Sequence, residues 1–517
     1  MHNTEMIIAY DLGTGGIKAS LFDLSGHSCG DTFSQYDVVY TGSDFHEQSP
    51  DVWFEGICST TKLLLAKSGT DPKSIVALSI SGHSLGVVPV DKNGRLLRSM
   101  TPIWSDTRAK QQIKAFFEKI PYRDWYLKTG NGFPAECYSI FKIMWYRDNE
   151  PALYQNAHMI LGSKDYCNLR LTGKMCTDHS YASGSGVYDL KKRCYDEEYI
   201  KASGVRRELL PELMHSHDVV GSLTSEAAAQ LGLTTDVKVV AGGVDNSCMA
   251  LGARGIENGR AYISLGSSSW IAVISDTPLV DEQKKPFVFA HVIDGMYASA
   301  TSIFSAGSSF RWVRDTFFPD LMRKERHGEI ADAYIAMNEL AALSPIGANN
   351  LQFNPSLAGG AMIEQSSNIV GAYVGLQLSH TRNDIVRASL EGITYNLWYA
   401  MMVLQSCGVS IDELLMVGGG AKSPFWRQMF ADIFGMNMVK TCVDQNAASL
   451  GAAALAAYGL GYWTDYAPID KAHELRSIEK PDKANTDQYR RHYELSRHIA
   501  GWLCETGDII SKGRQRQ

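Results

Sequence analysis

The chain has 517 residues, which is more than one hydrophobic core usually supports, so we expect two domains, or a two-lobed body with a cleft. Hydrophobic residues make up 45% and charged residues 20%, which is typical of a compact globular protein. The formal net charge of −7 argues against a nucleic-acid partner, and the absence of a bilayer-spanning run or signal-peptide pattern predicts no membrane partner and a cytoplasmic location.

The first predicted element is a hairpin. An apolar strand over residues 6–11 ends in Asp11, a glycine-rich turn follows, and a second strand covers residues 17–23. Asp11 can bind Mg²⁺ directly or through water, because carboxylates are the ligands that this cation prefers. A hairpin with a purely structural role could have the same sequence.

The turn of this hairpin has the chemistry of a phosphate site. Glycines lack a Cβ and let backbone N–H groups approach an anion closely. Thr14 and Gly15 can therefore donate to phosphate oxygens, and Lys18 adds positive charge.

The rest of the first half alternates helices and strands and ends near residue 250, where we place a domain boundary. The pattern predicts helices at 50–68 and 109–119 and strands at 75–80, 87–90 and 237–241. The last strand leads into Gly243-Val244-Asp245, close to the expected cleft. Phosphoryl transfer to an alcohol needs a carboxylate that accepts the hydroxyl proton, so Asp245 is the candidate base. A helix N-cap is the alternative interpretation.

Two strands of the second half also end in candidate phosphate or nucleotide turns. The predicted strand at 260–265 leads into Gly266 and Ser267, where a second phosphate group could bind, although a serine-rich turn is the simpler interpretation. The strand at 414–417 leads into Gly419, Gly420 and Ala421, where an adenosine could lie on the backbone before a helix. Triple glycine also occurs in plain turns. Helices are predicted at 424–434, 447–458 and 487–505.

Several familiar nucleotide and hydrolase motifs are missing. The sequence contains neither a P-loop nor the Gly-x-Gly-x-x-Gly fingerprint, and it lacks His-Glu-x-x-His and Gly-x-Ser-x-Gly. These absences argue against P-loop enzymes, Rossmann dehydrogenases, zinc proteases and serine hydrolases.

Taken in order, the turns resemble the FGGY family of carbohydrate kinases, relatives of actin and hexokinase, and the similarity runs nearly end to end. The segments that carry it are 11–18, 47–53, 81–82, 104–108, 142–145, 164–166, 171–173, 242–246, 371–376, 384–391 and 418–421. The pair 371–376 and 384–391 matches the family's C-terminal signature, whereas the region around Lys142 fits the N-terminal signature loosely. Within the family the chain is most similar to the xylulose kinase branch.

The resemblance implies an α/β fold with two ribonuclease-H-like domains of the actin and hexokinase type flanking a central cleft. Residues 1–250 would bind sugar and phosphate, and residues 251–517 would bind the nucleotide. ATP and Mg²⁺ are implied as cosubstrate and cofactor, and a homodimer as the assembly. The family roles would be Asp11 with magnesium, Thr14 and Gly15 with phosphate, Asp245 as base, Gly266 and Ser267 near the γ-phosphate, and Gly419 and Gly420 near adenosine. Asp245 and Asn246 are also expected to bind the substrate.

The sugar is expected to bind near the turn after the strand at 75–80. Xylulose kinases read Ser-Gly-Gln-Met-His-Gly there, and this chain has His83, Ser84 and Leu85 in place of Gln-Met-His. Leu85 cannot hydrogen-bond a sugar hydroxyl, which puts xylulose itself in doubt, while His83 and Ser84 could supply replacement contacts. Trp104 could pack against an apolar sugar face or belong to the core. The expected substrate is a ketopentose or a related ketose or polyol.

Two other functions stay open on the same fold. One is a nucleotide-driven conformational ATPase of the actin or chaperone type, which would not need Asp245. The other is a catalytically idle sugar sensor, against which the retained Asp11 and Asp245 argue.

Overall fold

The computed structural model describes residues 5–360 and 363–514, and a central β-sheet organises each half of the chain. The N-terminal sheet has the order β14-β15-β6-β1-β2-β3. Its strands are β1 (Met6–Leu12), β2 (Gly16–Asp23), β3 (Ser28–Gln35), β6 (Ile75–Gly82), β14 (Val219–Ser222) and β15 (Lys238–Val244).

The predicted hairpin at the N-terminus is confirmed, because β1 and β2 pair antiparallel with Asp11 opposite Lys18. Strands β6 and β15 run parallel to β1, with Asp11 opposite Ser81 and Ser81 opposite Gly243. The carboxyl ends of these three strands therefore meet at one edge of the sheet.

The C-terminal sheet repeats this plan, with the order β18-β19-β17-β16-β22-β23-β24. Strand β16 pairs antiparallel with β17 and parallel with β22, just as β1 pairs with β2 and β6. The strands are β16 (Ala261–Leu265), β17 (Ser269–Ser275), β18 (Phe287–Ala290), β19 (Tyr297–Ile303), β22 (Glu413–Val417), β23 (Asn437–Thr441) and β24 (Leu475–Glu479).

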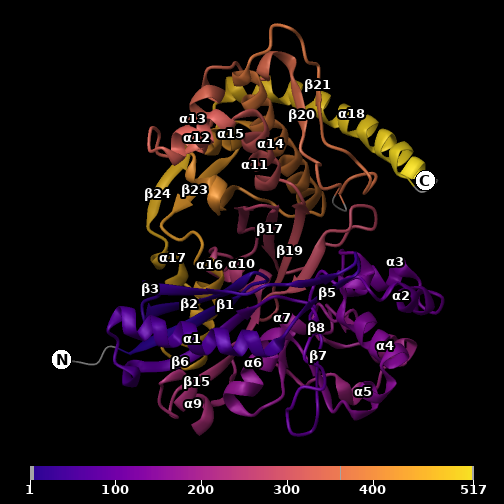
Figure 1. The fold of residues 1–517 in the computed structure, drawn as a ribbon, viewed down its shortest axis with the longest axis vertical. Helices are drawn as coiled ribbons and strands as arrows, with labels where there is room; N and C mark the ends of the chain where they lie inside the picture. The colour runs from indigo at the N-terminus through magenta and orange to yellow at the C-terminus, as the bar shows by residue number, and fades with distance from the viewer. Residues whose placement is uncertain (1–4, 361–362, 515–517) are drawn as a thin grey trace.

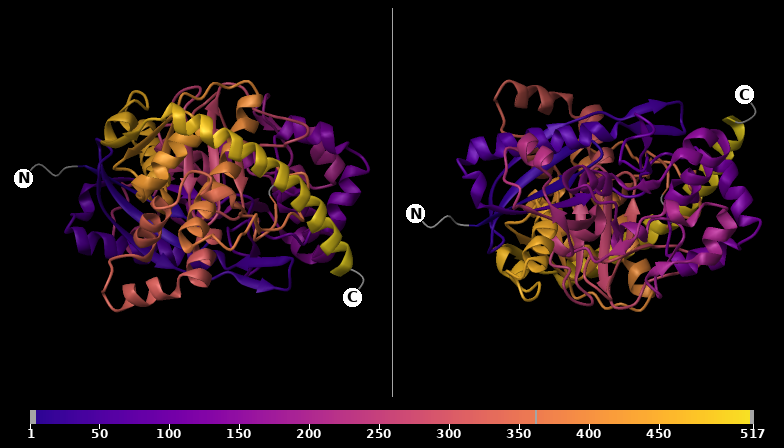
Figure 2. Two further views of the ribbon diagram at one scale, coloured as in Figure 1. Left: turned by 90° about the horizontal axis from the view of Figure 1, so that it is seen from above. Right: turned by 90° about the horizontal axis from the view of Figure 1, so that it is seen from below.

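Helices cover both sheets, and the predicted helical segments are all found. They are α1 (Pro50–Ser68), α2 (Lys110–Phe117), α15 (Pro424–Phe434), α16 (Ala447–Gly459) and α18 (Lys483–Arg514). Helix α18 is longer than the predicted 487–505 segment, and its last turns carry the exposed side chains Ile509 and Ile510. Figure 2 shows α18 running across one end of the molecule.

Helices α10 (Asp245–Gly252) and α16 pack closely against each other between the two halves (Figure 1). A Cβ on Gly252 would lie 1.8 Å from the Ala447 carbonyl oxygen, and one on Gly451 would lie 1.9 Å from the Cys248 carbonyl oxygen. Only glycine fits at both positions. The expected boundary near residue 250 falls inside α10 and stays a prediction.

The other elements complete the two halves. The remaining helices are α3 (Tyr122–Thr129), α4 (Ser139–Asn149), α5 (Pro151–Asn156), α6 (Ser163–Thr172), α7 (His179–Ala182), α8 (Glu197–Ser203), α9 (Ser225–Leu231), α11 (Gly307–Phe317), α12 (Pro319–Arg326), α13 (Ala333–Ala342), α14 (Arg382–Ser406) and α17 (Pro468–Ala472). The smaller sheets contain β4 (Val39–Thr41), β5 (Phe45–Gln48), β7 (Val88–Val90), β8 (Thr101–Pro102), β9 (Met159–Leu161), β10 (Thr177–Asp178), β11 (Tyr188–Asp189), β12 (Cys194–Tyr195), β13 (Leu213–Met214), β20 (Gln352–Asn354) and β21 (Ala372–Val374). Among the described residues, no helix is both long enough and apolar enough to cross a membrane.

Candidate active site

The Asp11 carboxylate lies at the carboxyl end of β1, on the sheet face that α16 covers. Side chains alternate along a strand, and Ile7 and Ala9 pack into the same apolar cluster as Leu450 of α16, so Asp11 points to this face as well. Burial raises the pKa of Asp11 to about 6, and the positive charge of Lys18 partly opposes this rise. A bound cation would stabilise the charged form.

Asp245 is the first residue of α10 and directly follows β15, whose carboxyl end lies beside that of β6. Val244 occupies the N-cap position, so the N-cap interpretation of Asp245 is wrong. Burial raises the pKa of Asp245 to about 7, and the negative charge of Asp11 contributes to the rise. The two carboxylates therefore lie at the same edge of the sheet. One Asp245 oxygen accepts the Asn246 N–H at 2.8 Å.

The N-terminus of α16 lies beside Lys18, the residue opposite Asp11 in the β1–β2 pair. Lys18 donates from Nζ to the Gln445 carbonyl oxygen at 3.2 Å and to Asn446 Oδ1 at 3.1 Å, which joins β2 to the residues just before α16. A helix N-terminus carries a partial positive charge that favours phosphate. Lys18 and this helix end can therefore act on the same anion.

The turn at Thr14 and Gly15 is open on its outer side. A Cβ on Gly15 would meet no described atom within 4 Å, so the side of Gly15 where a side chain would project is open. The Thr14 hydroxyl accepts the Trp104 indole N–H at 2.9 Å. The Trp104 side chain is 40% exposed, so its interpretation as a core residue is wrong, and it forms a wall beside the turn.

His83 and Ser84 follow β6 and are both buried. The His83 ring packs edge-on against Trp53 with 5.1 Å between ring centroids, and neither ring nitrogen has a hydrogen-bond partner among the described residues. Burial lowers the pKa of His83 to about 4, so the ring is neutral near pH 7 with one donor and one acceptor free. Leu85, with φ of 62°, is buried in the apolar core of the first half.

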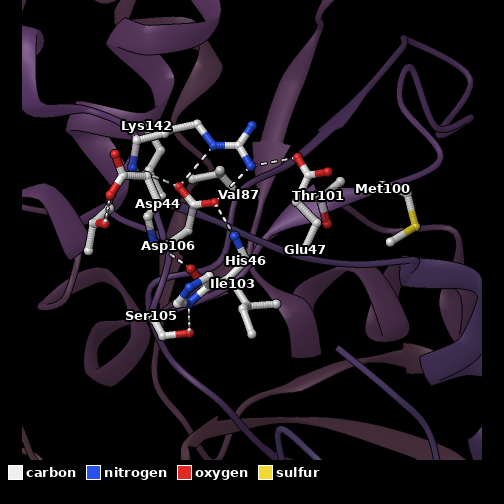
Figure 3. A network of polar contacts seen from close by, with 12 residues as sticks. Asp44, His46, Glu47, Val87, Met100, Thr101, Ile103, Ser105, Asp106 and Lys142 are labelled. Carbon is white, nitrogen blue, oxygen red and sulfur yellow. Dashed lines mark hydrogen bonds and ion pairs between the residues drawn. The ribbon is translucent and has the colours of Figure 1, made fainter. Parts of the chain in front are cut away.

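Lys142 holds the turn at residues 83–85 against the segment that carries Trp104. Its buried ammonium group donates to the Leu85 carbonyl oxygen at 3.1 Å and the Ile103 carbonyl oxygen at 2.7 Å. Asp106 anchors the same segment by accepting the His46 N–H at 2.8 Å, in the network that Figure 3 shows. The loosely matching region around Lys142 therefore has a structural function beside the candidate site.

The second half contains a cavity of about 770 Å³. It brings together the two predicted turns, since Gly266 and Ser267 line it together with Gly419 and Gly420. The other lining residues are Leu265, Gly307, Phe310, Arg311, Asp332, Tyr334, Ile335, Asn338, Glu339, Ala342, Lys422, Ser423, Pro424, Phe425 and Trp426. Apolar and aromatic walls with a few polar groups are typical of a small-molecule site.

The turn at Gly266 and Ser267 is held by the start of α11. Gly307 N–H donates to the Gly266 carbonyl oxygen at 3.0 Å, and a Cβ on Gly307 would lie 2.4 Å from that oxygen. Arg311, one turn into α11, donates to Ser267 Oγ at 3.0 Å. A guanidinium group therefore lies beside the predicted phosphate-binding hydroxyl.

Ala421 departs from the predicted set. The glycines after β22 form a 3₁₀ turn, η5 (Gly419–Lys422), and this turn directs the Ala421 side chain into the hydrophobic core. Gly419 and Gly420 face the cavity, whereas Ala421 is fully buried and does not line it.

The sequence interpretation missed several residues of this cavity. Arg311 and Lys422 supply positive charge, and the buried Asn338 side-chain oxygen has no hydrogen-bond partner within the part of the chain that the structure describes. The position of Arg311, four residues after a glycine that opens a helix, is a weak local signal. Asn338 reaches the cavity only through the packing of α13, which sequence spacing does not reveal.

Comparison with protein-family models gives two matches. The N-terminal domain of the FGGY family of carbohydrate kinases matches residues 6–252, and the C-terminal domain of that family matches residues 261–460. Together they cover most of the chain.

Named relatives of similar length include kinases of more than one sugar. A xylulose kinase of Bacillus subtilis is 30% identical over 498 residues, covering 95% of this chain and 96% of that protein. A gluconokinase of Bacillus licheniformis is 27% identical over 489 residues, covering 94% of each.

Solved structures share the complete fold. A ligand-bound xylulose kinase from Lactobacillus acidophilus superposes with a TM-score of 0.89 at 26% identity, over 98% of this chain and 100% of that one. A gluconate kinase from the same organism superposes with a TM-score of 0.88 at 26% identity, over 98% of this chain and 99% of that one. The predicted two-domain α/β fold is confirmed.

Proposed function

Since the chain belongs to the FGGY family of carbohydrate kinases, we propose that it transfers the γ-phosphoryl group of ATP to a hydroxyl of a ketopentose, or of a related ketose or polyol, with Asp245 as the general base. The observation that carries this proposal is the pair Asp11 and Asp245 at one sheet edge. Asp11 lies at the carboxyl end of β1 and Asp245 directly follows β15, and both strands belong to the parallel set β1, β6 and β15.

ATP would bind with its base and ribose in the 770 Å³ cavity and its phosphates directed to Asp11. Lys422 supports this path, because it lines that cavity and also a neighbouring cavity of about 450 Å³ that contains Lys18 and Asn446. Cationic side chains thus follow the route from the nucleotide cavity to the carboxylates. They would offset the charge of the phosphates.

Asp11 fits the role of a Mg²⁺ ligand. Its half-buried carboxyl group has an elevated pKa, and a cation would stabilise its charged form. The described residues offer no cluster of three or more metal-ligating side chains, which suits a cation held by one or two carboxylates, water and phosphates. Bound Mg²⁺ would neutralise negative charge on the phosphates during transfer.

Asp245 is well suited to accept a hydroxyl proton. One of its oxygens binds the Asn246 N–H, and the other is available to a substrate. A pKa of about 7 lets the carboxylate be largely ionised just above neutral pH while still accepting a proton in the transition state.

A neutral sugar fits the surroundings of His83 better than a sugar acid. The free donor and acceptor of the neutral imidazole suit hydroxyl groups, and the exposed Trp104 ring offers a face for C–H groups. Lys142 is committed to two backbone carbonyl oxygens and is not available to a carboxylate. The ketopentose is therefore preferred over gluconate. A cytoplasmic location and a homodimer stay predictions.

The test is ADP release measured over D-xylulose, D-ribulose, D-gluconate and glycerol. We expect the highest kcat/KM with a ketopentose, and Asp245→Asn should lower kcat by about 10²- to 10⁴-fold because the base is lost. Asp236→Asn, an exposed aspartate just before β15, is the matched control and should keep full activity.

Three outcomes would count against the proposal. Sugar-independent ATP turnover that survives Asp245→Asn would indicate a conformational ATPase. Sugar binding with no ADP release in the presence of Mg–ATP would indicate a sensor. Preferred turnover of gluconate would overturn the assigned substrate class alone.

A further inference from the structure

A fully buried ionic cluster lies behind the segment that leads into Asp245. Lys164 Nζ is 2.6 Å from Asp165 Oδ1 and 2.8 Å from Asp178 Oδ1, and all three side chains are at most 1% exposed. Removing three charges from water is expensive, and an apolar cluster of similar size is often as stable. Stability alone therefore does not account for this cluster.

The cluster contacts the backbone of β15 just before Asp245. The Ala241 carbonyl oxygen accepts from Lys164 Nζ at 3.3 Å and from Asn168 Nδ2 at 2.9 Å. The Ser180 hydroxyl donates to Asp178 and accepts the Val244 N–H at 2.9 Å. The residue before Asp245 is thus held by a side chain that the ionic cluster orients.

The β15 backbone needs such support, because its pairing with β6 is interrupted there. The register shifts between Val240 and Gly243, and Gly242 adopts a φ of 69°. A bulge of this kind leaves backbone groups outside the ladder and changes the direction of the strand. A Cβ on Gly243 would lie 3.0 Å from Ser180 Oγ, so a glycine there lets the hydroxyl approach.

We propose that Lys164, Asp178 and Ser180 act as positioning residues that fix the direction of the Asp245 carboxylate toward the sugar hydroxyl. This inference rests on the proposed function of Asp245. The order of contacts is Lys164 to Asp178, Asp178 to Ser180, and Ser180 to the Val244 N–H. A displacement of about 1 Å at a reacting group can lower a rate by about 10²-fold, so a small loss of support at Val244 would be visible in kcat.

Ser180→Ala is the most informative variant, because it removes the contact to the Val244 N–H and leaves the ionic cluster in place. We expect kcat to fall by about 10- to 100-fold, with the KM values for sugar and ATP changed by less than about threefold. Ser203→Ala is the matched control: Ser203 is also buried, donates to a backbone carbonyl oxygen and accepts the Val205 N–H at 3.1 Å, but it lies in α8. This control should keep kcat within about twofold.

A double-mutant cycle separates positioning from general damage to the fold. In an Asp245→Asn background, Ser180→Ala should have no further effect on the residual rate, because the residue that it positions is absent. Asp178→Asn should behave like Ser180→Ala, and thermal unfolding of every variant gives its folded fraction.

The inference is overturned if Ser180→Ala keeps kcat within about threefold, or if it lowers the residual rate of Asp245→Asn by the same factor as in the wild type. If Asp245→Asn itself keeps activity, the base assignment fails and the positioning inference fails with it. Loss of activity in Asp245→Asn with none in Ser180→Ala refutes the positioning network alone.

Discussion

At the scale of single residues, the negative charge on Asp245 lowers the stability of the folded chain. Under the proposed function, the same carboxylate accepts the hydroxyl proton. Burial and the nearby Asp11 raise the pKa of Asp245 from 3.8 to about 7, so the folded chain binds this proton more tightly than the unfolded chain. Stability must then fall as pH rises from about 4 to about 7, and it stays lower above that range.

This direction of the pH dependence predicts how Asp245→Asn affects the free energy of unfolding. The free energy of unfolding of the variant should exceed that of the wild type by about 1 to 3 kcal/mol at pH 8, and the difference should shrink toward zero by about pH 3, where Asp245 is largely protonated in both states. Chemical denaturation at a series of pH values, without nucleotide, measures the difference. The exposed Asp236→Asn should show no such trend. A constant difference, or one that grows toward low pH, would contradict the elevated pKa.

At the scale of elements, the close contact of α10 and α16 connects the two halves near the carboxylates. Gly451 of α16 lies so close to α10 that a Cβ would be 1.9 Å from the Cys248 carbonyl oxygen. Because Asp245 begins α10, any separation of the two helices would also move the candidate base.

Gly451→Ala should therefore lower both kcat and the melting temperature. Overpacking at a backbone contact costs about 1 to 3 kcal/mol, and the displaced Asp245 should reduce kcat by about tenfold or more. Gly501→Ala in α18 is the control, since a Cβ there meets no atom within 4 Å, and it should stabilise the protein slightly by improving helix propensity. Thermal unfolding and steady-state kinetics measure both effects. Equal behaviour of the two variants would contradict the helix-contact argument.

The elements that depend on local sequence could be predicted, and those that depend on tertiary contact could not. The hairpin around Asp11 follows from an apolar run, an acid and glycines that are adjacent in the chain. Arg311 reaches Ser267 across 44 residues, and Ser180 reaches Val244 across 64, so no spacing rule reveals these contacts. Ala421 was predicted to bind the nucleotide because it follows Gly419 and Gly420, yet the 3₁₀ turn directs its side chain into the hydrophobic core.

At the scale of the whole molecule, the two halves share one plan and differ in chemistry. Strands β1 and β6 correspond to β16 and β22, and each first strand leads into a glycine turn. The first half carries the carboxylate Asp11 at the end of β1, just before its turn, whereas the turn of the second half carries Ser267 with Arg311 beside it. Under the proposed function, the metal and the sugar would bind to one half and the nucleotide to the cavity of the other.

This division predicts that sugar and nucleotide bind cooperatively. Lys18 of the first half donates to the Gln445 carbonyl oxygen and to Asn446 at the start of α16, so it can transmit the position of one half to the other. Saturating sugar should lower the Kd of a non-hydrolysable ATP analogue by about 5- to 50-fold, as measured by calorimetry. Lys18→Met should reduce this factor to about twofold or less while leaving the affinity for sugar alone unchanged. Lys62 is exposed, and in Lys62→Met sugar should lower the Kd of the ATP analogue by the same factor as in the wild type. Independent binding in the wild type, or an undiminished factor in Lys18→Met, would exclude Lys18 as the link between the halves.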